Sequence, residues 1–130
     1  MASLIEILLE ADTKIIREMP KATVKIERLS KLLDTDFALE IRGLTQRELM
    51  NLPDGGTEAL NQKLILGIMN IDFANSKLCE KFTPDGRKTP LTPPEVLDVL
   101  FLPGEKVNIA KFINELSGFG ENAIEKIEKN

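Results

Sequence analysis

The sequence predicts an α+β fold that is mostly α-helical and carries one small antiparallel β-hairpin. Two short segments alternate apolar and polar residues, as strands do, whereas most of the remaining chain has apolar residues at helical spacing. Three helix-start signatures of the form S/T-x-x-E support the helical part. With 130 residues, the chain is long enough to bury a core without disulfides or metal ions.

The hairpin is predicted from residues 23–29 and 37–42, joined through residues 30–36. The second segment has a clean apolar face, whereas Arg28 interrupts the face of the first. Two strands alone are only marginally stable, so their apolar face should lie against helices. The residues expected on that face are Val24, Ile26, Phe37, Leu39 and Ile41.

The first helix is predicted from a capping box at residues 3–6, in which two side chains satisfy free backbone N–H groups. Helical spacing continues to Pro20, and Asp12 is placed to cap a second turn. An amphipathic terminal helix also suits a membrane surface, but Glu6 and Glu10 would repel anionic lipids. We therefore expect this helix to pack on the core or on a partner protein.

Further helices are predicted downstream of the hairpin. A second capping box at residues 45–48 opens a short helix, and apolar spacing over 57–71 marks a longer one. Asp72 is placed to cap a helix that contains Phe73. A third capping box at residues 92–95 opens the next helix, with proline at the first position, where no N–H donor is needed.

The C-terminal part is predicted to end in two more helices. Gly118 suits the left-handed position that ends the first of them, and Phe119 is expected to pack back near Ile113. The apolar residues of the last helix would be Ala123, Ile124 and Ile127.

A proline-rich stretch divides the chain. We predict an N-terminal helix, hairpin and helices in residues 1–82, a loop at 83–94, and C-terminal helices in residues 95–130. A single compact domain is the simplest interpretation at this length.

Composition argues against several classes of function. The chain has no histidine and one cysteine, Cys79, so the commonest general acid/base and the usual zinc ligands are missing. We predict no enzymatic activity, no catalytic residue, no metal site and no cofactor. The interleaved charges, 17 Lys+Arg against 21 Asp+Glu, and the lack of tryptophan and tyrosine argue against nucleic acid. No apolar run reaches the ~20 residues that span a bilayer, so we expect no membrane partner and a cytoplasmic location.

Three local features each have an ordinary structural interpretation. The sequence Asp34-Thr35-Asp36 resembles the start of a calcium loop, but the following residues do not fit, so a solvated turn is predicted. Cys79 is expected to be packed in the core. A charged group is expected to form weak, solvated ion pairs, with a partner-binding patch as the alternative. Its members are Glu40, Arg42, Arg47 and Glu48.

The densest apolar cluster after the proline-rich stretch supplies the candidate partner-binding residues. They are Leu97, Phe101, Leu102 and Phe112. Core packing is their simplest interpretation, and an exposed surface that receives a partner helix is the main functional alternative.

Several phrases of the sequence resemble one protein family. Residues 88–90 (KTP) and 96–105 (VLDVLFLPGE) lead into a helix that ends in ELSGFG at 115–120. Upstream, FALEIRGLTQRE at 37–48 has the form of a strand that passes into a helix. Together these phrases resemble the XkdN-like phage tail assembly chaperones, with residues 91–94 as a departure that lengthens the linker.

The resemblance implies a cytoplasmic protein of the bacterial host, encoded by a phage, prophage or phage-tail-like particle and absent from the finished virion. Such chaperones are thought to bind the tape measure protein and to recruit tail tube subunits before polymerisation, and self-association is an open alternative. The family carries no catalytic residues to transfer. A structural tail or head–tail connector subunit is the second hypothesis, and an accessory domain with lysine or carboxylate chemistry is a distant third.

Resemblance to tail assembly chaperones also raises the question of a second, longer product made by a −1 ribosomal slip. The final residues Glu128-Lys129-Asn130 are compatible with the codons GAA-AAA-AAC, which contain the slippery heptamer A-AAA-AAC. A frayed, charged helix end is the simpler interpretation. The nucleotide sequence distinguishes the two.

Overall fold

The computed structural model describes residues 3–127, and its elements confirm a mostly helical α+β fold with one antiparallel hairpin. The final residues Glu128, Lys129 and Asn130 lie outside the described part. In chain order the elements are α1 (Leu4–Glu10), α2 (Thr13–Arg17), β1 (Lys21–Lys25), α3 (Glu27–Leu32), β2 (Ala38–Arg42), α4 (Gln46–Met50), α5 (Gly56–Gly67), α6 (Ser76–Phe82), α7 (Pro93–Leu100), α8 (Pro103–Asn114) and the π-helical turn η1 (Glu115–Phe119).

The hairpin pairs β1 with β2, with Val24 opposite Leu39. The first strand is shorter than predicted, because residues 27–32 form helix α3 instead of continuing the strand. The Ile26 N–H still donates to the Phe37 carbonyl at 2.9 Å, and the Ile26 carbonyl then accepts from the first helical turn. The prediction that residues 23–29 form one strand was therefore wrong, and a helix connects the two strands.

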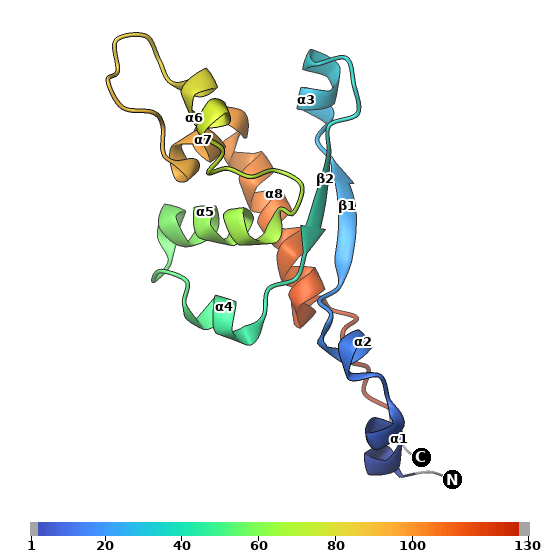
Figure 1. Cartoon of the computed structure of the whole chain (residues 1–130). Coiled ribbons are helices and arrows are strands. Elements are labelled where there is room, and N and C mark those ends of the chain that lie inside the picture. Colours follow the sequence, from blue (N-terminus) through green and yellow to red (C-terminus); the bar gives the residue numbers. More distant parts are fainter. Residues whose placement is uncertain (1–2, 128–130) are drawn as a thin grey trace.

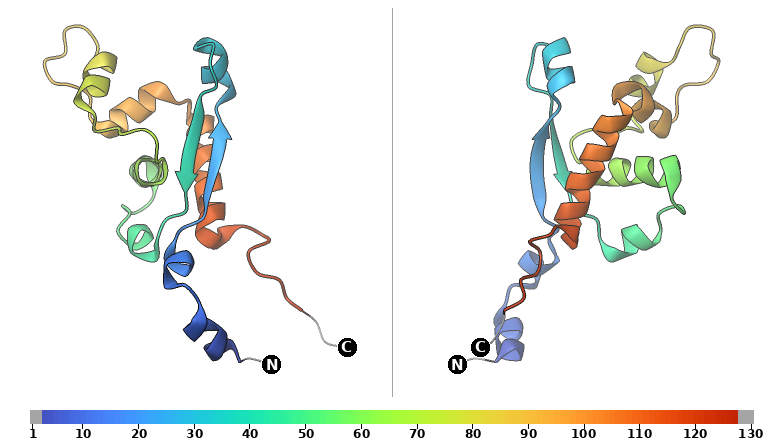
Figure 2. Two further views of the ribbon diagram at one scale, coloured as in Figure 1. Left: turned by 45° about the vertical axis from the view of Figure 1, so that its right-hand side comes forward. Right: turned by 180° about the vertical axis from the view of Figure 1, so that it is seen from behind.

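Figures 1 and 2 show the hairpin lying across α8, with α5, α6 and α7 on the other side of that helix. Helix α8 packs against α5, and α7 packs against both α5 and α6. Three of the five apolar hairpin residues, Ile26, Leu39 and Ile41, are buried in the shared core, and the other two pack against it. The remaining buried apolar residues are Leu29, Leu44, Leu64, Ile68, Phe73, Cys79, Leu91, Val96, Leu97, Phe101, Ile109, Ala110 and Ile113.

Two glycines allow the backbone to approach this core closely. A Cβ on Gly43 would lie 2.4 Å from the Leu116 carbonyl oxygen, and one on Gly67 would lie 2.5 Å from Ile113 Cδ1. The residue after β2 therefore lies against the backbone of η1 in a way that requires glycine, whereas a side chain at residue 67 would require the Ile113 side chain to shift.

The helix boundaries between α5 and α8 differ in detail from those predicted. Helix α5 ends at Gly67, and Asn75, not Asp72, caps α6 by accepting from the Leu78 N–H at 3.0 Å. Phe73 therefore lies before the helix. The capping box at Thr92 is confirmed. The three-part division at 83–94 stays a prediction.

Beyond α8, only part of the predicted structure forms. Gly118 has a φ of 96°, which confirms the left-handed position. Phe119 is 69 % exposed, so the prediction that it packs near Ile113 was wrong. Residues 120–127 are not helical, and residues 121–127 are exposed, so the predicted last helix does not form; a short segment that buries no apolar face is only marginally stable as a helix.

Residues 3–18, which we call the arm, hold α1 and α2 and extend away from the rest of the molecule (Figure 1). Both predicted caps form: the Ser3 side chain accepts from the Glu6 N–H at 3.3 Å, and Asp12 accepts from the Lys14 N–H at 2.9 Å. Neither helix has a buried residue. The arm therefore does not pack on the core, and its packing on a partner protein stays a prediction.

Candidate partner-binding surface

The four apolar residues predicted to bind a partner are divided by the structure into two buried and two exposed side chains. Leu97 and Phe101 are 0 % and 2 % exposed, so they hold α7 in the core and cannot contact a partner in this conformation. Leu102 is 51 % exposed and Phe112 is 44 % exposed. The partner-binding role of these two stays a prediction, and the other two support the helices that carry them.

Helix α8 presents one exposed face toward the hairpin. Here Ile109 and Phe112 face Val24 and Ile26 across a groove of about 400 Å³, which we call the β1–α8 groove. An ion pair crosses its rim, because the Arg28 guanidinium lies 2.8 Å from the Glu105 carboxylate. The sequence alone gave no signal for this groove, since its two walls are some 80 residues apart in the chain.

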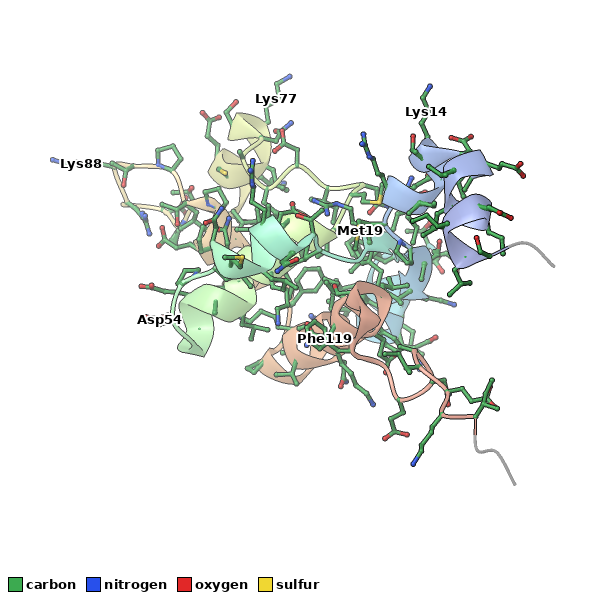
Figure 3. All side chains as sticks on the ribbon, turned by 90° about the horizontal axis from the view of Figure 1, so that it is seen from below. Lys14, Met19, Asp54, Lys77, Lys88 and Phe119 are labelled. Carbon is green, nitrogen blue, oxygen red and sulfur yellow. The ribbon has the colours of Figure 1, made fainter. Side chains whose placement is uncertain are left out.

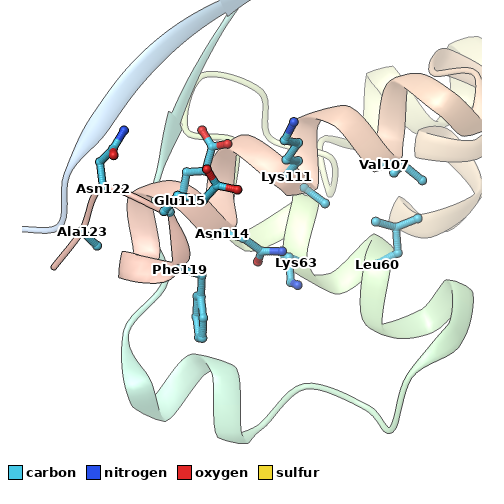
Figure 4. A pocket seen from close by; sticks show the side chains of 12 residues that line it. Leu60, Lys63, Val107, Lys111, Asn114, Glu115, Phe119, Asn122 and Ala123 are labelled. Atoms are coloured by element: carbon cyan, nitrogen blue, oxygen red, sulfur yellow. The ribbon is translucent and has the colours of Figure 1, made fainter. Parts of the chain in front are cut away.

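The other exposed face of α8 lines a larger groove of about 1070 Å³, which we call the α5–α8 groove. Figure 4 shows Leu60 and Lys63 on α5 facing residues of α8, with Phe119 at one end. The α8 residues follow the spacing i, i+3, i+4, i+7, which places them on one side of the helix. They are Val107, Ala110, Lys111 and Asn114.

A buried lysine holds α8 between the two grooves. Lys106 is 6 % exposed, and its ammonium donates to Asn61 on α5 at 2.9 Å and to Asp98 on α7 at 2.5 Å. A buried charge is tolerated only when it is paired and hydrogen-bonded, as here. The three helices α5, α7 and α8 are thus tied together at one point.

Ion pairs fix other parts of the frame. Arg42 donates to both carboxylate oxygens of Glu48 at 2.8 and 2.7 Å, which ties β2 to α4 and lowers the pKa of Glu48 to about 2. The pKa of Glu105 is also lowered, mainly by its hydrogen bonds from Arg28. Of the predicted charged group, Arg42 and Glu48 therefore form a bidentate pair within the fold.

The remaining sequence features have structural roles. Cys79 is buried, as predicted, and its thiol lies 3.3 Å from the Phe73 carbonyl oxygen. In the predicted turn, Asp34 adopts a left-handed φ of 51°, and Asp36 pairs with Lys25 at 3.2 Å. Within residues 3–127, no group of three or more Cys, Asp or Glu side chains is arranged to hold a metal ion. In the same residues, no helix is both long and apolar enough to cross a bilayer.

Comparison with known proteins identifies the family. The model of the phage XkdN-like tail assembly chaperone proteins matches residues 56–130, which include α5 to η1 and both walls of the α5–α8 groove. No curated protein and no solved structure matches the chain. Since the match covers more than half of the sequence, the chain belongs to the family of XkdN-like phage tail assembly chaperones.

Proposed function

We propose that this chaperone binds the tape measure protein of its phage or prophage and helps to recruit tail tube subunits before the tube polymerises. It would act in the cytoplasm of the bacterial host and be absent from the finished particle. The observation that supports this function best is the exposure of Leu102 and Phe112 at the two ends of a helix that is fixed on both sides.

The shape of the surface suits a helical client. An amphipathic helix binds by placing apolar residues into a groove between rigid walls, and a few apolar anchors usually dominate the affinity. Phe112 lines the β1–α8 groove, and Leu102 lies at the start of the same helix. A rigid groove loses little conformational freedom on binding, which favours a holding function.

The test is co-expression with the tape measure protein of the same phage or prophage, followed by pull-down. The double variant Leu102→Ser, Phe112→Ser should weaken capture by about tenfold or more, because two anchors are lost. Both side chains are about half exposed, so the melting temperature should change little. The matched control is Leu32→Ser, Leu33→Ser on the hairpin side, which removes two exposed leucines elsewhere and should leave capture unchanged. Equal capture by both variants would refute the role of α8.

A second measurement separates the chaperone from a structural tail or connector subunit. Mass spectrometry of purified particles should not detect the chain, because an assembly chaperone leaves before completion. Recovery of the chain in fixed ratio to the tube protein would instead make it a structural subunit.

A further inference from the structure

We propose that the arm of one copy docks in the α5–α8 groove of a second copy of this chain. The inference concerns self-association and does not depend on which client the chaperone binds. It is based on an apolar arm without a packing surface, a groove with an apolar floor, and matching charges along both.

The arm exposes an unusual amount of apolar surface. Its large apolar residues are 53–79 % exposed. They are Leu4, Ile5, Ile7, Leu8, Leu9, Ile15 and Ile16. Helices of seven and five residues are marginal in water by themselves, so α1 and α2 need a surface to stabilise them. A contiguous exposed apolar patch of this kind marks an interaction site.

The groove offers a complementary apolar floor. Leu60 and Ala110 line its base, while Val107 and Phe119 remain 57 % and 69 % exposed at its sides. The groove has a volume of about 1070 Å³, and Figure 4 shows its lining residues on α5, on α8 and around Phe119.

The acidic half of the arm matches the basic half of the groove. Glu6 and Glu10 stand four residues apart and therefore lie on one side of α1. Lys63 on α5 and Lys111 on α8 both line the α5–α8 groove. None of these four residues takes part in an ion pair among residues 3–127. With α1 in this groove, its acidic side can turn toward the lysines that line it.

Beyond α1 and the two lysines, the next charges along the arm and along the groove are also of opposite sign. Helix α2 carries Lys14 and Arg17, and the η1 end of the groove carries Glu115 and Glu121. If α1 lies along the two lysines, α2 falls toward these acids. The match of two charges of each sign in the same order sets one direction for the arm, since the reverse direction would place like charges together.

A second copy is a better occupant than the chain's own arm. The Pro20 carbonyl accepts from the Gly43 N–H at 2.9 Å, which fixes the point where the arm leaves the hairpin. From there the arm runs away from α5 in every view (Figures 1 and 2). In this arrangement the arm is directed outward, where another copy can receive it.

The experiment is a charge exchange between arm and groove, measured by sedimentation velocity over a range of concentrations. The arm variant Glu6→Lys, Glu10→Lys and the groove variant Lys63→Glu, Lys111→Glu should each associate at least about tenfold more weakly than the wild type. An equimolar mixture of the two variants should associate again, because each reversed arm then meets an oppositely charged groove. If the single variants were weak only because α1 or the rest of the chain had unfolded, mixing them would not restore association.

The control reverses two lysines that lie away from the groove. Lys77 is on α6 and Lys88 is in the proline-rich loop, both at the periphery and distant from Phe119 (Figure 3). The variant Lys77→Glu, Lys88→Glu should associate like the wild type. A wild type that stays monomeric up to about 1 mM, or a mixture of the charge variants that fails to associate, would overturn the proposal.

Discussion

Helix α1 of the arm and helix α7 of the folded part are both rich in apolar residues, but only α7 buries them. Helix α1 exposes all of its apolar residues, whereas Val96 and Leu97 of α7 are completely buried. The difference lies in what fixes each helix. A single residue pair, Phe101 and Leu102, links α7 to α8, and a hydrogen bond from the Leu91 N–H to Thr83 Oγ1 at 3.0 Å holds its other end.

The arm has no comparable second attachment among the described residues, since it is joined to the hairpin only through Glu18 to Pro20. Apolar spacing therefore predicts that a helix forms and which face it would bury, but it does not predict what covers that face. For α7 the cover is the same chain. For α1 no cover is found among the described residues, and we propose that another molecule supplies it.

The largest effect on stability is expected when a charge is placed at a buried apolar position, and we compare it with a charge at an exposed one. Ile41 is 0 % exposed, and Ile41→Asp should lower the free energy of unfolding by about 4 kcal/mol or more, because an unpaired carboxylate would be buried. In the arm, Leu8→Asp should change it by less than about 0.5 kcal/mol. Urea denaturation of both variants at low protein concentration measures the difference. A similar loss in both would mean that the arm packs on the core.

A smaller effect is expected where the fold depends on a glycine. Gly43→Ala should cost about 2–3 kcal/mol, because the new methyl group would meet the Leu116 carbonyl at 2.4 Å and this backbone cannot move aside easily. The control is Gly104→Ala in the first turn of α8, where nothing lies within 4 Å and alanine favours the helix. Thermal unfolding distinguishes them, and an unchanged Gly43→Ala melting temperature would show that β2 and η1 do not touch in solution.

The sequence predicted the parts of the fold that depend on local chemistry. The capping boxes at Thr45 and Thr92, the strand β2 and the left-handed Gly118 all formed, because each is determined by a few neighbouring residues. Residues 27–29 were misassigned because the alternation of Val24 and Ile26 was extended past Arg28, whereas Leu29 and Leu32 stand at helical spacing.

Long-range contacts were beyond the reach of sequence patterns. The exposed Phe119, the missing last helix and the α5–α8 groove all depend on which surfaces meet in space. For the same reason, only some residues of the predicted binding cluster are exposed. Sequence spacing shows that Leu97, Phe101 and Leu102 are close together, but it does not show which of them are covered by α5 and α6.

The dependence of stability on pH tests an ion pair in the folded part of the chain outside the arm. The pKa of Glu48 is lowered from 4.5 to about 2 in the fold by its hydrogen bonds from Arg42. A lowered pKa contributes stability above the unfolded value, and this contribution is lost as pH falls from about 4.5 to about 2. Glu48→Gln should therefore reduce the acid sensitivity in this window by about 1–2 kcal/mol after allowance for solvent screening.

The control for this test is Glu58→Gln in the first turn of α5, which takes part in no ion pair among residues 3–127. It should keep the acid sensitivity of the wild type. If both variants behave alike between pH 4.5 and 2, the pair of Arg42 and Glu48 does not stabilise the fold.

Substitutions in the arm are expected to have the smallest effect on the stability of the dilute protein. Replacing Leu4, Leu8 and Ile15 by serine removes exposed apolar groups, so the melting temperature of the dilute protein should stay within experimental error. At high concentration the result should differ, because association that requires the folded state raises the wild-type melting temperature by mass action. A wild type that gains stability with concentration, beside a serine variant that does not, would show that the arm is covered by another molecule. If the variant already melts lower when dilute, the arm stabilises its own chain and the contrast with α7 is lost.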